Sequence, residues 1–355
     1  MGDLMEKKNY LEWLSSQTPT AWWHDSGDPS ELEQGKAWGA VGATTNPVLV
    51  LQALRKNGEC CSSNLKEIDQ STPPQQKAQL LTRAVVRNAA GLFERMYNES
   101  KRQRGYVCAQ LDPALAADRD AMIEMAKHFS AWAPNVSVKF PATSAGLDAL
   151  EECVAQGSCA TSTVSFTVPQ VIAAAERYEH GRARAERAGL NPSPCFAVIM
   201  IGRIDDYLRE VALDRRAHVL EEDIKSAGLA VTKRAYSIFR QRKYRAKLLI
   251  AALRGPYHMT GLCGAEIVMS IHPKIQKILI DQNVQRGNGI EDPIPKEAIK
   301  RLQTIPEFIK AYEPNVLHEQ DFITFGVTQK TLSQFSAGGW SLMEAMKLPT
   351  NAWQA

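Results

Sequence analysis

Short apolar segments alternate with long amphipathic segments along most of this chain, and this alternation limits the possible folds more than any single motif does. The intervening segments show helical periodicity, most clearly at residues 114–133, 144–156, 169–188 and 206–228. Eight short segments are rich in β-branched or aromatic residues, which is typical of strands; they are residues 20–25, 40–44, 105–111, 136–140, 160–166, 195–201, 247–253 and 266–270. Eight strands that alternate with helices predict an α/β fold, a closed parallel (β/α)8 TIM barrel.

An open doubly wound parallel sheet is the alternative fold. Such a sheet usually carries a glycine-rich phosphate-binding turn after its first strand, and the sequence contains neither GxGxxG nor GxxxxGK[ST]. A length of 355 residues is ordinary for one barrel, so we expect residues 1–355 to form a single domain. Residues 57–74 are polar and predict a loop before a helix near residues 77–98. Residues 293–355 contain two or three further helical stretches, which we expect as a C-terminal extension packed on the barrel or over its mouth.

Composition excludes several classes of partner. The formal net charge is +3, which is too small to indicate nucleic acid or a membrane surface. A basic stretch at residues 233–247 is interleaved with aromatic residues, but these fall largely on one helical stripe and predict a solvated outer helix of the barrel. Seven cysteines are scattered without CxxC spacing, no run of 18 apolar residues occurs, and the start MGDLMEKKNYLEWL lacks the apolar core of a signal peptide. We therefore expect a soluble, cytoplasmic protein.

In a barrel of this kind the active site lies at the carboxyl ends of the strands. The polar residues predicted at those ends are Asp25, Asn46, Gln110, Lys139, Thr161, Thr163, Arg203 and Arg254. The histidines form no HExxH or other metal-binding pattern, so no metal is expected.

Lys139 is the most informative of these candidates. It lies in NVSVKFPAT, inside an otherwise apolar strand. Burial penalises its ammonium form and lowers its pKa, which would produce a neutral amine nucleophile. The alternative is a strand-end lysine that reaches solvent or pairs with a carboxylate. The strand alone does not decide between the two.

The other candidates also have ordinary structural interpretations. The position of Asp25 is typical of a turn residue that caps the following helix. The position of Asn46, in TTNP, is typical of a turn residue before proline. Arg203 and Arg254 each follow an apolar strand. Two such arginines suit a phosphate, whose oxygens a guanidinium binds in a bidentate way, but surface ion pairs are the alternative.

Four motifs in order resemble the transaldolase family, including its fructose-6-phosphate aldolase branch. HDSGD resembles the first-strand DTGD motif, and ATTNPVLV resembles the TTNPSL motif of the second strand. VSVKFPATSAGLDAL resembles the KIPAT motif that carries the Schiff-base lysine, and MIGRIDD resembles the VGRI motif. The resemblance runs from about residue 24 to 254, with a similar tail at DFITFGVTQKTLSQFSAGGW. It implies the barrel fold, sugar phosphate substrates, a homodimer and no cofactor.

The resemblance also implies roles for individual residues. Lys139 would be the Schiff-base lysine, Asp25 the acid/base of C–C cleavage, and Thr163 the residue that helps hold a catalytic water. Asn46 would bind the hydroxyls of a dihydroxyacetone unit. Arg203 and Arg254 would bind the phosphate group.

The sequence departs from the family pattern around the substrate. Gln110 stands where ordinary transaldolases have a glutamate that activates the water, a feature shared with the aldolase branch. That branch has a tyrosine where Met200 falls, and Thr161 replaces an asparagine that contacts the substrate. Val198 and Ala252 replace serines near the substrate and the phosphate. These departures predict a non-standard sugar substrate.

Three functions are therefore compatible with the sequence. The first is a transaldolase that passes a dihydroxyacetone unit from a ketose phosphate to an aldose acceptor, as in pentose phosphate metabolism. The second is a class I aldolase that releases free dihydroxyacetone; Gln110 favours it and Met200 disfavours it. The third is a catalytically weak barrel kept for binding, which the presence of Lys139, Asp25 and Asn46 argues against.

Overall fold

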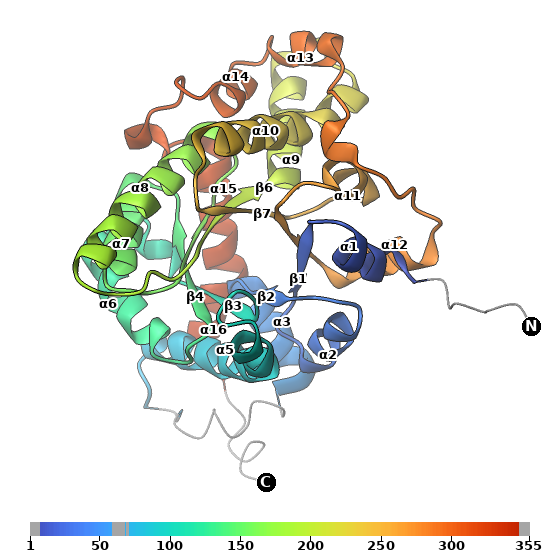
Figure 1. The fold of residues 1–355 in the computed structure, drawn as a ribbon. Helices are drawn as coiled ribbons and strands as arrows, with labels where there is room; N and C mark the ends of the chain where they lie inside the picture. Colours follow the sequence, from blue (N-terminus) through green and yellow to red (C-terminus); the bar gives the residue numbers. More distant parts are fainter. Residues whose placement is uncertain (1–7, 59–67, 69–70, 348–355) are drawn as a thin grey trace, which may run out of the picture.

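Eight parallel strands close into a barrel in their order along the chain (Figure 1). The computed structural model describes residues 8–58, 68 and 71–347. The strands are β1 Ala21–Asp25, β2 Gly42–Thr44, β3 Tyr106–Gln110, β4 Val136–Pro141, β5 Ala160–Thr163, β6 Cys195–Met200, β7 Lys247–Ala251 and β8 Val268–Ile271. The predicted (β/α)8 TIM barrel is confirmed, and an open doubly wound sheet is excluded because β1 pairs with β8.

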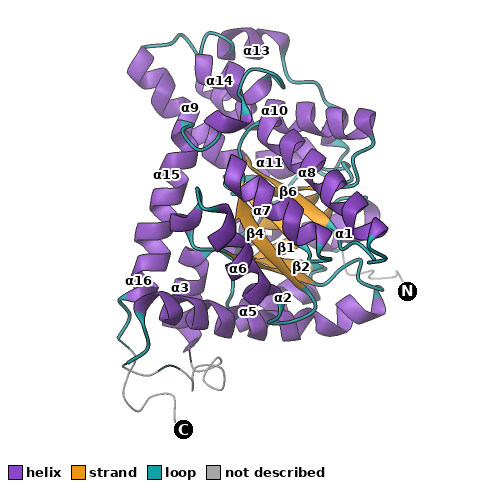
Figure 2. Cartoon of the chain, turned by 90° about the vertical axis from the view of Figure 1, so that its left-hand side faces the viewer, coloured by secondary structure: helices purple, strands orange, loops and turns teal. Residues whose placement is uncertain are grey.

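Helices surround the strands on all sides (Figure 2). Those up to the last strand are α1 Tyr10–Gln17, α2 Pro29–Ala37, α3 Pro47–Asn57, α5 Pro74–Glu99, α6 Arg119–Ser130, α7 Ser144–Ala155, α8 Val168–Arg187, α9 Ile201–Arg215, α10 Glu221–Arg242 and α11 Pro256–Leu262. After β8 follow α12 Pro273–Asp281, α13 Lys296–Leu302, α14 Pro306–Tyr312, α15 Gly326–Phe335 and α16 Ser341–Glu344.

Three predicted boundaries are wrong for local reasons. The segment 206–228 is not one helix, because the chain turns at Arg216, whose φ is 52°, and separates α9 from α10. The segment 114–133 begins as a short 3₁₀ turn, and α6 starts only at Arg119, after the N-cap Asp118. The predicted strand 160–166 ends at Thr163, because Val164 adopts a φ of 52°.

Polar caps fix where several helices leave the barrel. The side chains of Asp28, Asn46, Thr143 and Thr167 accept backbone N–H groups at the starts of α2, α3, α7 and α8. Each cap satisfies an N–H group that the first helical turn leaves without a partner. These caps therefore set the short loops that follow β1, β2, β4 and β5, which are the loops that border the barrel mouth.

The barrel interior changes from aromatic to polar along the strand direction. Near the amino ends, Trp23 packs against Phe196 with ring centroids 4.6 Å apart, and Phe196 packs against Tyr106 at 5.7 Å. Higher in the barrel, the Ser137 and Thr161 hydroxyls form a hydrogen bond of 2.7 Å. Lys139 lies two residues beyond Ser137 along β4. Apolar packing thus closes the amino end and leaves polar side chains at the carboxyl end.

The four α-helices in residues 293–347 pack in two places. α13 and α14 contact α10, whereas α15 contacts α9 and α16 contacts α5. Figures 1 and 2 together show α15 and α16 lying across one end of the barrel. The sequence predicted two or three helical stretches here; the structure has four α-helices among the residues it describes.

The basic stretch at 233–247 forms the second half of α10, the following turn and the start of β7. Arg234 pairs with Glu313 at 2.6 Å, and Arg242 pairs with Glu176 at 3.1 Å. The predicted outer helix is therefore confirmed for this part of α10. The predicted helix near residues 77–98 is also present, as α5. The N-terminal residues 1–7, Cys60 and Cys61 lie outside the described residues.

Five cysteines are described, and all are buried as free thiols. None of the described helices combines the length and the apolar character needed to cross a membrane.

Candidate active site

A cavity of about 320 Å³ opens at the carboxyl ends of the strands. Six of the eight predicted site residues line it: Asp25, Asn46, Lys139, Thr163, Arg203 and Arg254. Its wall also includes Phe335 at the end of α15, so the C-terminal helices form part of the site. Residues from β1, β4, β5, α9 and the end of α15 thus meet in one place.

Lys139 lies in β4 with only 7% of its surface exposed. Its Nζ donates a hydrogen bond of 2.9 Å to the backbone oxygen of Thr45. Burial lowers the pKa of Lys139, and the nearby Cys108 and Asp25 oppose this only in part. The structure thus excludes the solvent-reaching alternative and favours a lysine that loses its proton easily.

Asp25 ends β1 and faces the same cavity. Its Oδ1 accepts a hydrogen bond of 2.7 Å from the Thr44 hydroxyl, which in turn contacts the Ser270 hydroxyl. The helix-cap interpretation of Asp25 is wrong, because α2 is capped by Asp28. The Asp25 carboxylate is therefore available to act on a ligand beside Lys139.

Asn46 caps a helix and also lines the cavity. Its Oδ1 accepts the backbone N–H groups of Val48 and Leu49 at 3.0 and 3.1 Å, which caps α3. The residue also lines the cavity. Because the cap uses the oxygen, the Nδ2 group is the part of Asn46 that is suited to donate to a hydroxyl or carbonyl of a ligand.

Gln110 and Thr161 do not line the cavity. Both are buried and both are register neighbours of Lys139, on β3 and β5. The Thr161 hydroxyl bonds to Ser137, whereas Gln110 Oε1 is buried without a hydrogen-bond partner among the described residues. A buried carbonyl oxygen without a partner costs about 1–3 kcal/mol, so Gln110 leaves an acceptor unsatisfied directly beside the lysine.

Thr163 lines the cavity at the end of β5, and the residue after it is strained. Val164 is buried and has a φ of 52°, a region that β-branched residues rarely occupy. Such strain costs about 1–3 kcal/mol and persists only where surrounding contacts enforce it. The turn at Val164 ends β5 at Thr163 and fixes this hydroxyl at the cavity wall.

Arg203 lies in the first turn of α9, with its guanidinium 5.2 Å from the centre of the Phe335 ring. Its Nη1 contacts Gln334 and lies 3.5 Å from the Thr331 hydroxyl. Burial and the neighbouring Arg254 lower the pKa of Arg203 to about 10. A bound anion would relieve both effects, because it compensates the charge of each arginine.

Arg254 follows β7, and Asp206 holds its guanidinium. Its Nε and Nη2 atoms lie 2.9 and 2.7 Å from Asp206 Oδ2, and Nη1 donates to the Ala252 oxygen at 2.9 Å. About two fifths of each side chain is exposed, so this ion pair is weak. A phosphate dianion at the cavity could therefore share or replace the Asp206 contact.

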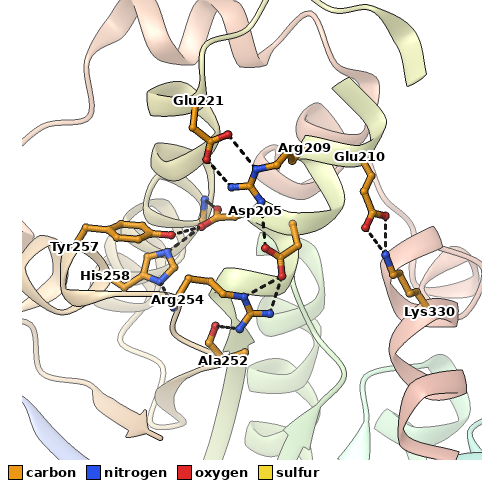
Figure 3. A network of polar contacts seen from close by, with 11 residues as sticks. Asp205, Arg209, Glu210, Glu221, Ala252, Arg254, Tyr257, His258 and Lys330 are labelled. Atoms are coloured by element: carbon orange, nitrogen blue, oxygen red, sulfur yellow. Dashed lines mark hydrogen bonds and ion pairs between the residues drawn. The ribbon is translucent and has the colours of Figure 1, made fainter. Parts of the chain in front are cut away.

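A buried pair, Asp205 and His258, supports the backbone of Arg254 (Figure 3). His258 Nδ1 accepts the Arg254 backbone N–H at 3.2 Å, and Nε2 lies 2.9 Å from Asp205 Oδ2. Because Nδ1 accepts the Arg254 N–H, Nε2 is the nitrogen suited to donate to Asp205. Asp205 also accepts the Gly228 N–H at 2.7 Å, and burial raises the pKa of its carboxyl. The pair joins α9, α10 and α11 behind the cavity.

We expect His258→Phe to lower the free energy of unfolding by about 1.5–3 kcal/mol, because it removes a hydrogen bond to the buried Asp205 carboxylate. Urea titration at pH 7 measures this. The double variant Asp205→Asn with His258→Phe is the control and should recover part of the loss, since it removes the stranded charge. A loss below about 1 kcal/mol in the single variant would show that the pair has no structural importance.

Three of the departures from the family pattern also lie at the cavity: Val198, Met200 and Ala252. Val198 and Met200 make the β6 wall apolar. Ala252 has a φ of 59°, and this turn directs its backbone oxygen to Arg254. The changed positions are thus concentrated around the space that a substrate would occupy.

Several cavity residues were not predicted from the sequence. Thr44, which bonds Asp25, precedes the predicted Asn46 by two residues and could have been found from the TTNP motif. His272 lines the cavity at the end of β8 and caps α12. Phe335 lies in the tail that resembles the family, but no local pattern marks this side chain as a cavity residue. Within the described ranges, no three His, Cys, Asp or Glu side chains gather as metal ligands would.

The fold and the cavity define a (β/α)8-barrel protein with a buried lysine, a carboxylate and two arginines at the active-site end. A family model described as transaldolase/fructose-6-phosphate aldolase matches residues 22–345. The chain belongs to this family.

Curated relatives agree with this assignment. The chain is 30% identical over 248 residues to "Transaldolase 1" of Streptomyces avermitilis, covering 65% of this chain and 64% of the relative. It is 30% identical over 240 residues to "Transaldolase 1" of Streptomyces coelicolor, covering 63% and 61%. "Transaldolase" of Neisseria meningitidis serogroup A is 28% identical over 215 residues, 59% of each chain. The chain thus spans less than two thirds of the length of these relatives.

Proposed function

We propose that the protein is a transaldolase, which transfers a dihydroxyacetone unit from a ketose phosphate to an aldose acceptor through a Schiff base on Lys139. The observation that carries this proposal is the buried Lys139 amine, whose pKa is lowered, in one cavity with Asp25 and two arginines. A neutral amine is required for attack on a carbonyl. Family membership supports the same type of activity.

The first half of the reaction forms the imine. Lys139 Nζ attacks the ketose carbonyl and gives a carbinolamine, and loss of water gives the Schiff base. Thr163 lines the cavity and is suited to hold the water that moves protons in this step. Gln110 can orient that water but cannot accept its proton, because an amide is not a base at neutral pH.

The second half breaks and remakes a C–C bond. Asp25 takes the proton of the C4 hydroxyl, the C3–C4 bond breaks, and the aldose leaves while an enamine stays on Lys139. The acceptor aldehyde then adds to the enamine and Asp25 returns the proton. Water hydrolyses the new imine, which releases the product ketose and restores the Lys139 amine. Asn46 is placed to donate from Nδ2 to a hydroxyl of the three-carbon unit. Thr161 stays a predicted substrate contact, although its hydroxyl bonds to Ser137 in the free protein.

Arg203 and Arg254 are proposed to bind the phosphate of the donor. Both line the cavity, and each lies on the loop or helix that follows a barrel strand. We further propose a cytoplasmic location, which the free thiols of the described cysteines support, and a homodimer, which only the resemblance suggests.

The substrate is proposed to differ from the usual pentose phosphate pathway sugars. Val198 and Met200 replace polar or aromatic family residues with aliphatic ones in the cavity wall, which changes the hydrogen bonds open to a sugar. Gln110 also favours the second candidate, an aldolase that releases free dihydroxyacetone. A catalytically weak binding barrel is disfavoured by the complete lysine, carboxylate and arginine set.

One assay separates these functions. The purified protein is incubated with a panel of ketose phosphates, with and without an aldose phosphate acceptor, and free dihydroxyacetone and the new ketose are quantified. A transaldolase makes a new ketose only when the acceptor is present. Free dihydroxyacetone formed at an equal rate without acceptor would instead assign the aldolase, and no product from any donor would assign the binding barrel.

Gln110→Glu tests whether the site has been rebuilt around an amide. We expect slower imine formation with a pH optimum moved upward, because a new carboxylate next to Lys139 raises the pKa of its ammonium form and removes the nucleophile at neutral pH. Stopped-flow measurement of imine formation between pH 6 and 10 checks this. An increase of about 10–100-fold in the rate of imine formation, with no change in the high-pH part of the profile, would contradict this expectation. It would show that the site merely lacks a base.

A further inference from the structure

A second cavity lies at the opposite end of the barrel, among the amino ends of the strands. Its volume is about 730 Å³, within the range of small-molecule sites. The floor is apolar and includes Trp23, Phe196 and Val268. No residue of the proposed active site takes part in it.

Five cationic side chains line this cavity: Arg104, Arg240, Lys243, Arg245 and Lys247. The lining contains one carboxylate, that of Glu266. Because the whole chain has a net charge of only +3, this is a local concentration of positive charge. Among the described residues, Arg245 pairs with Glu179 at 3.7 Å, and the other four cations have no ion pair.

The end of α10 explains part of this cluster. Arg240 lies in the last turn of the helix and Lys243 is its C-cap, where a cation interacts favourably with the helix dipole. That explanation does not cover Arg104, which precedes β3, or Lys247, which begins β7. Residues 240–247 and the segment before β3 therefore bring like charges to one cavity, and a bound anion would offset their repulsion.

Aromatic rings form the wall between the basic rim and the apolar floor. The Tyr236 hydroxyl accepts the Glu266 backbone N–H at 3.2 Å, and the Tyr244 hydroxyl donates to Glu176 at 2.7 Å. Phe239 packs against Tyr244 with ring centroids 5.2 Å apart. These contacts hold the rings in place, and the Arg240 guanidinium lies 6.0 Å from the centre of the Tyr236 ring, so a flat ligand would meet a wall that needs no further ordering.

We propose that this cavity binds a small aromatic anion of nucleotide size, with its anionic groups on the basic rim and its ring against the aromatic wall. The charge of the rim selects the anion, and the apolar floor and rings select the flat body. This binding site is independent of the proposed transaldolase reaction, because the two cavities share no residue.

Isothermal titration of the full-length protein with ATP, tripolyphosphate and adenosine tests the proposal. ATP carries both the ring and the anionic groups, whereas the other two probes each lack one part. We expect saturable binding of ATP with one site per chain, and binding at least about tenfold weaker for each of the other probes.

Two sets of variants locate the binding. Arg240→Gln with Lys243→Gln should weaken ATP binding about tenfold or more, because it removes two rim charges. The matched control, Lys225→Gln with Lys310→Gln, removes two exposed charges elsewhere and should leave the affinity unchanged. Arg254→Ala should also leave it unchanged, which separates this cavity from the active-site one.

Any one of several results would overturn the proposal. They include the absence of saturable ATP binding, equal binding by tripolyphosphate or by adenosine, equal affinity in the rim variant and its control, and loss of binding in Arg254→Ala. A further probe is single-stranded RNA of increasing length. Affinity that rises with RNA length, with several protein chains bound per strand, would assign the basic rim to a nucleic-acid surface instead.

Discussion

Lys139→Met is expected to reduce kcat by about 10⁴-fold or more, because it removes the buried nucleophile of the covalent step, whereas the other lysine of the cavity wall, Lys274, is exposed. Methionine has nearly the length of lysine and no amine, so the variant removes the nucleophile without leaving a large void. Steady-state assays with the donor that the product assay identifies measure the loss. The control is Lys225→Met, an exposed lysine on α10, which should retain full activity.

The same variant should be more stable than the parent protein at pH 7. The pKa of Lys139 is lower in the folded protein than in the unfolded chain, so the unfolded chain binds the proton more strongly. Below the ordinary lysine pKa this difference disfavours folding, and the effect disappears as the pH rises through that value. We expect Lys139→Met to raise the free energy of unfolding by about 1–2 kcal/mol. A clear loss of stability together with activity would mean that Lys139 is a structural residue.

Activity should follow the same titration. On the acid side, kcat/KM of the parent protein should increase with pH, because deprotonation of Lys139 produces the nucleophile. The midpoint of this increase in kcat/KM should lie at a pH below the ordinary pKa of lysine.

Arg254→Ala is expected to raise KM for a phosphorylated donor by about 30-fold or more, which corresponds to about 2–4 kcal/mol of lost charge-assisted hydrogen bonding. Turnover of the same ketose without its phosphate should change little. The arginine lines the cavity, and in the free protein an exposed pair with Asp206 and one hydrogen bond to the Ala252 oxygen hold its guanidinium.

Arg215→Ala provides the matched control for this experiment. Arg215 ends α9 and pairs with Glu307, away from the cavity, so its loss should leave KM unchanged for both substrates. An equal loss on the phosphorylated and the unphosphorylated ketose in Arg254→Ala would show that the residue acts on the structure of the site and not on the phosphate.

The barrel could be predicted because its signals are local. Each strand is a short apolar run, and the polar residues that follow it come to one end of any parallel barrel. Lys139, Asp25 and the two arginines were placed correctly at the cavity for this reason. The helix break at Arg216 was missed, because its left-handed conformation leaves no pattern in the hydrophobic period.

Depth inside the barrel could not be read from the sequence. The alternation of a strand shows which residues face inward, and both Thr161 and Thr163 do so. The stagger of the neighbouring strands sets the level at which the cavity begins, and the sequence does not show this level. Thr163 reaches the cavity, whereas Thr161 lies below it and is bonded to Ser137. The Asp205–His258 pair was missed for a related reason, since its members lie on different helices.

Borohydride trapping is the most direct test of the central claim that Lys139 forms a Schiff base. The parent protein is incubated with each candidate ketose phosphate, reduced with borohydride, and analysed by intact mass and peptide mapping. The expected result is one three-carbon adduct per chain, located on Lys139 and absent from Lys139→Met. An adduct on any other lysine, or equal trapping in the variant, would contradict this account of the active site.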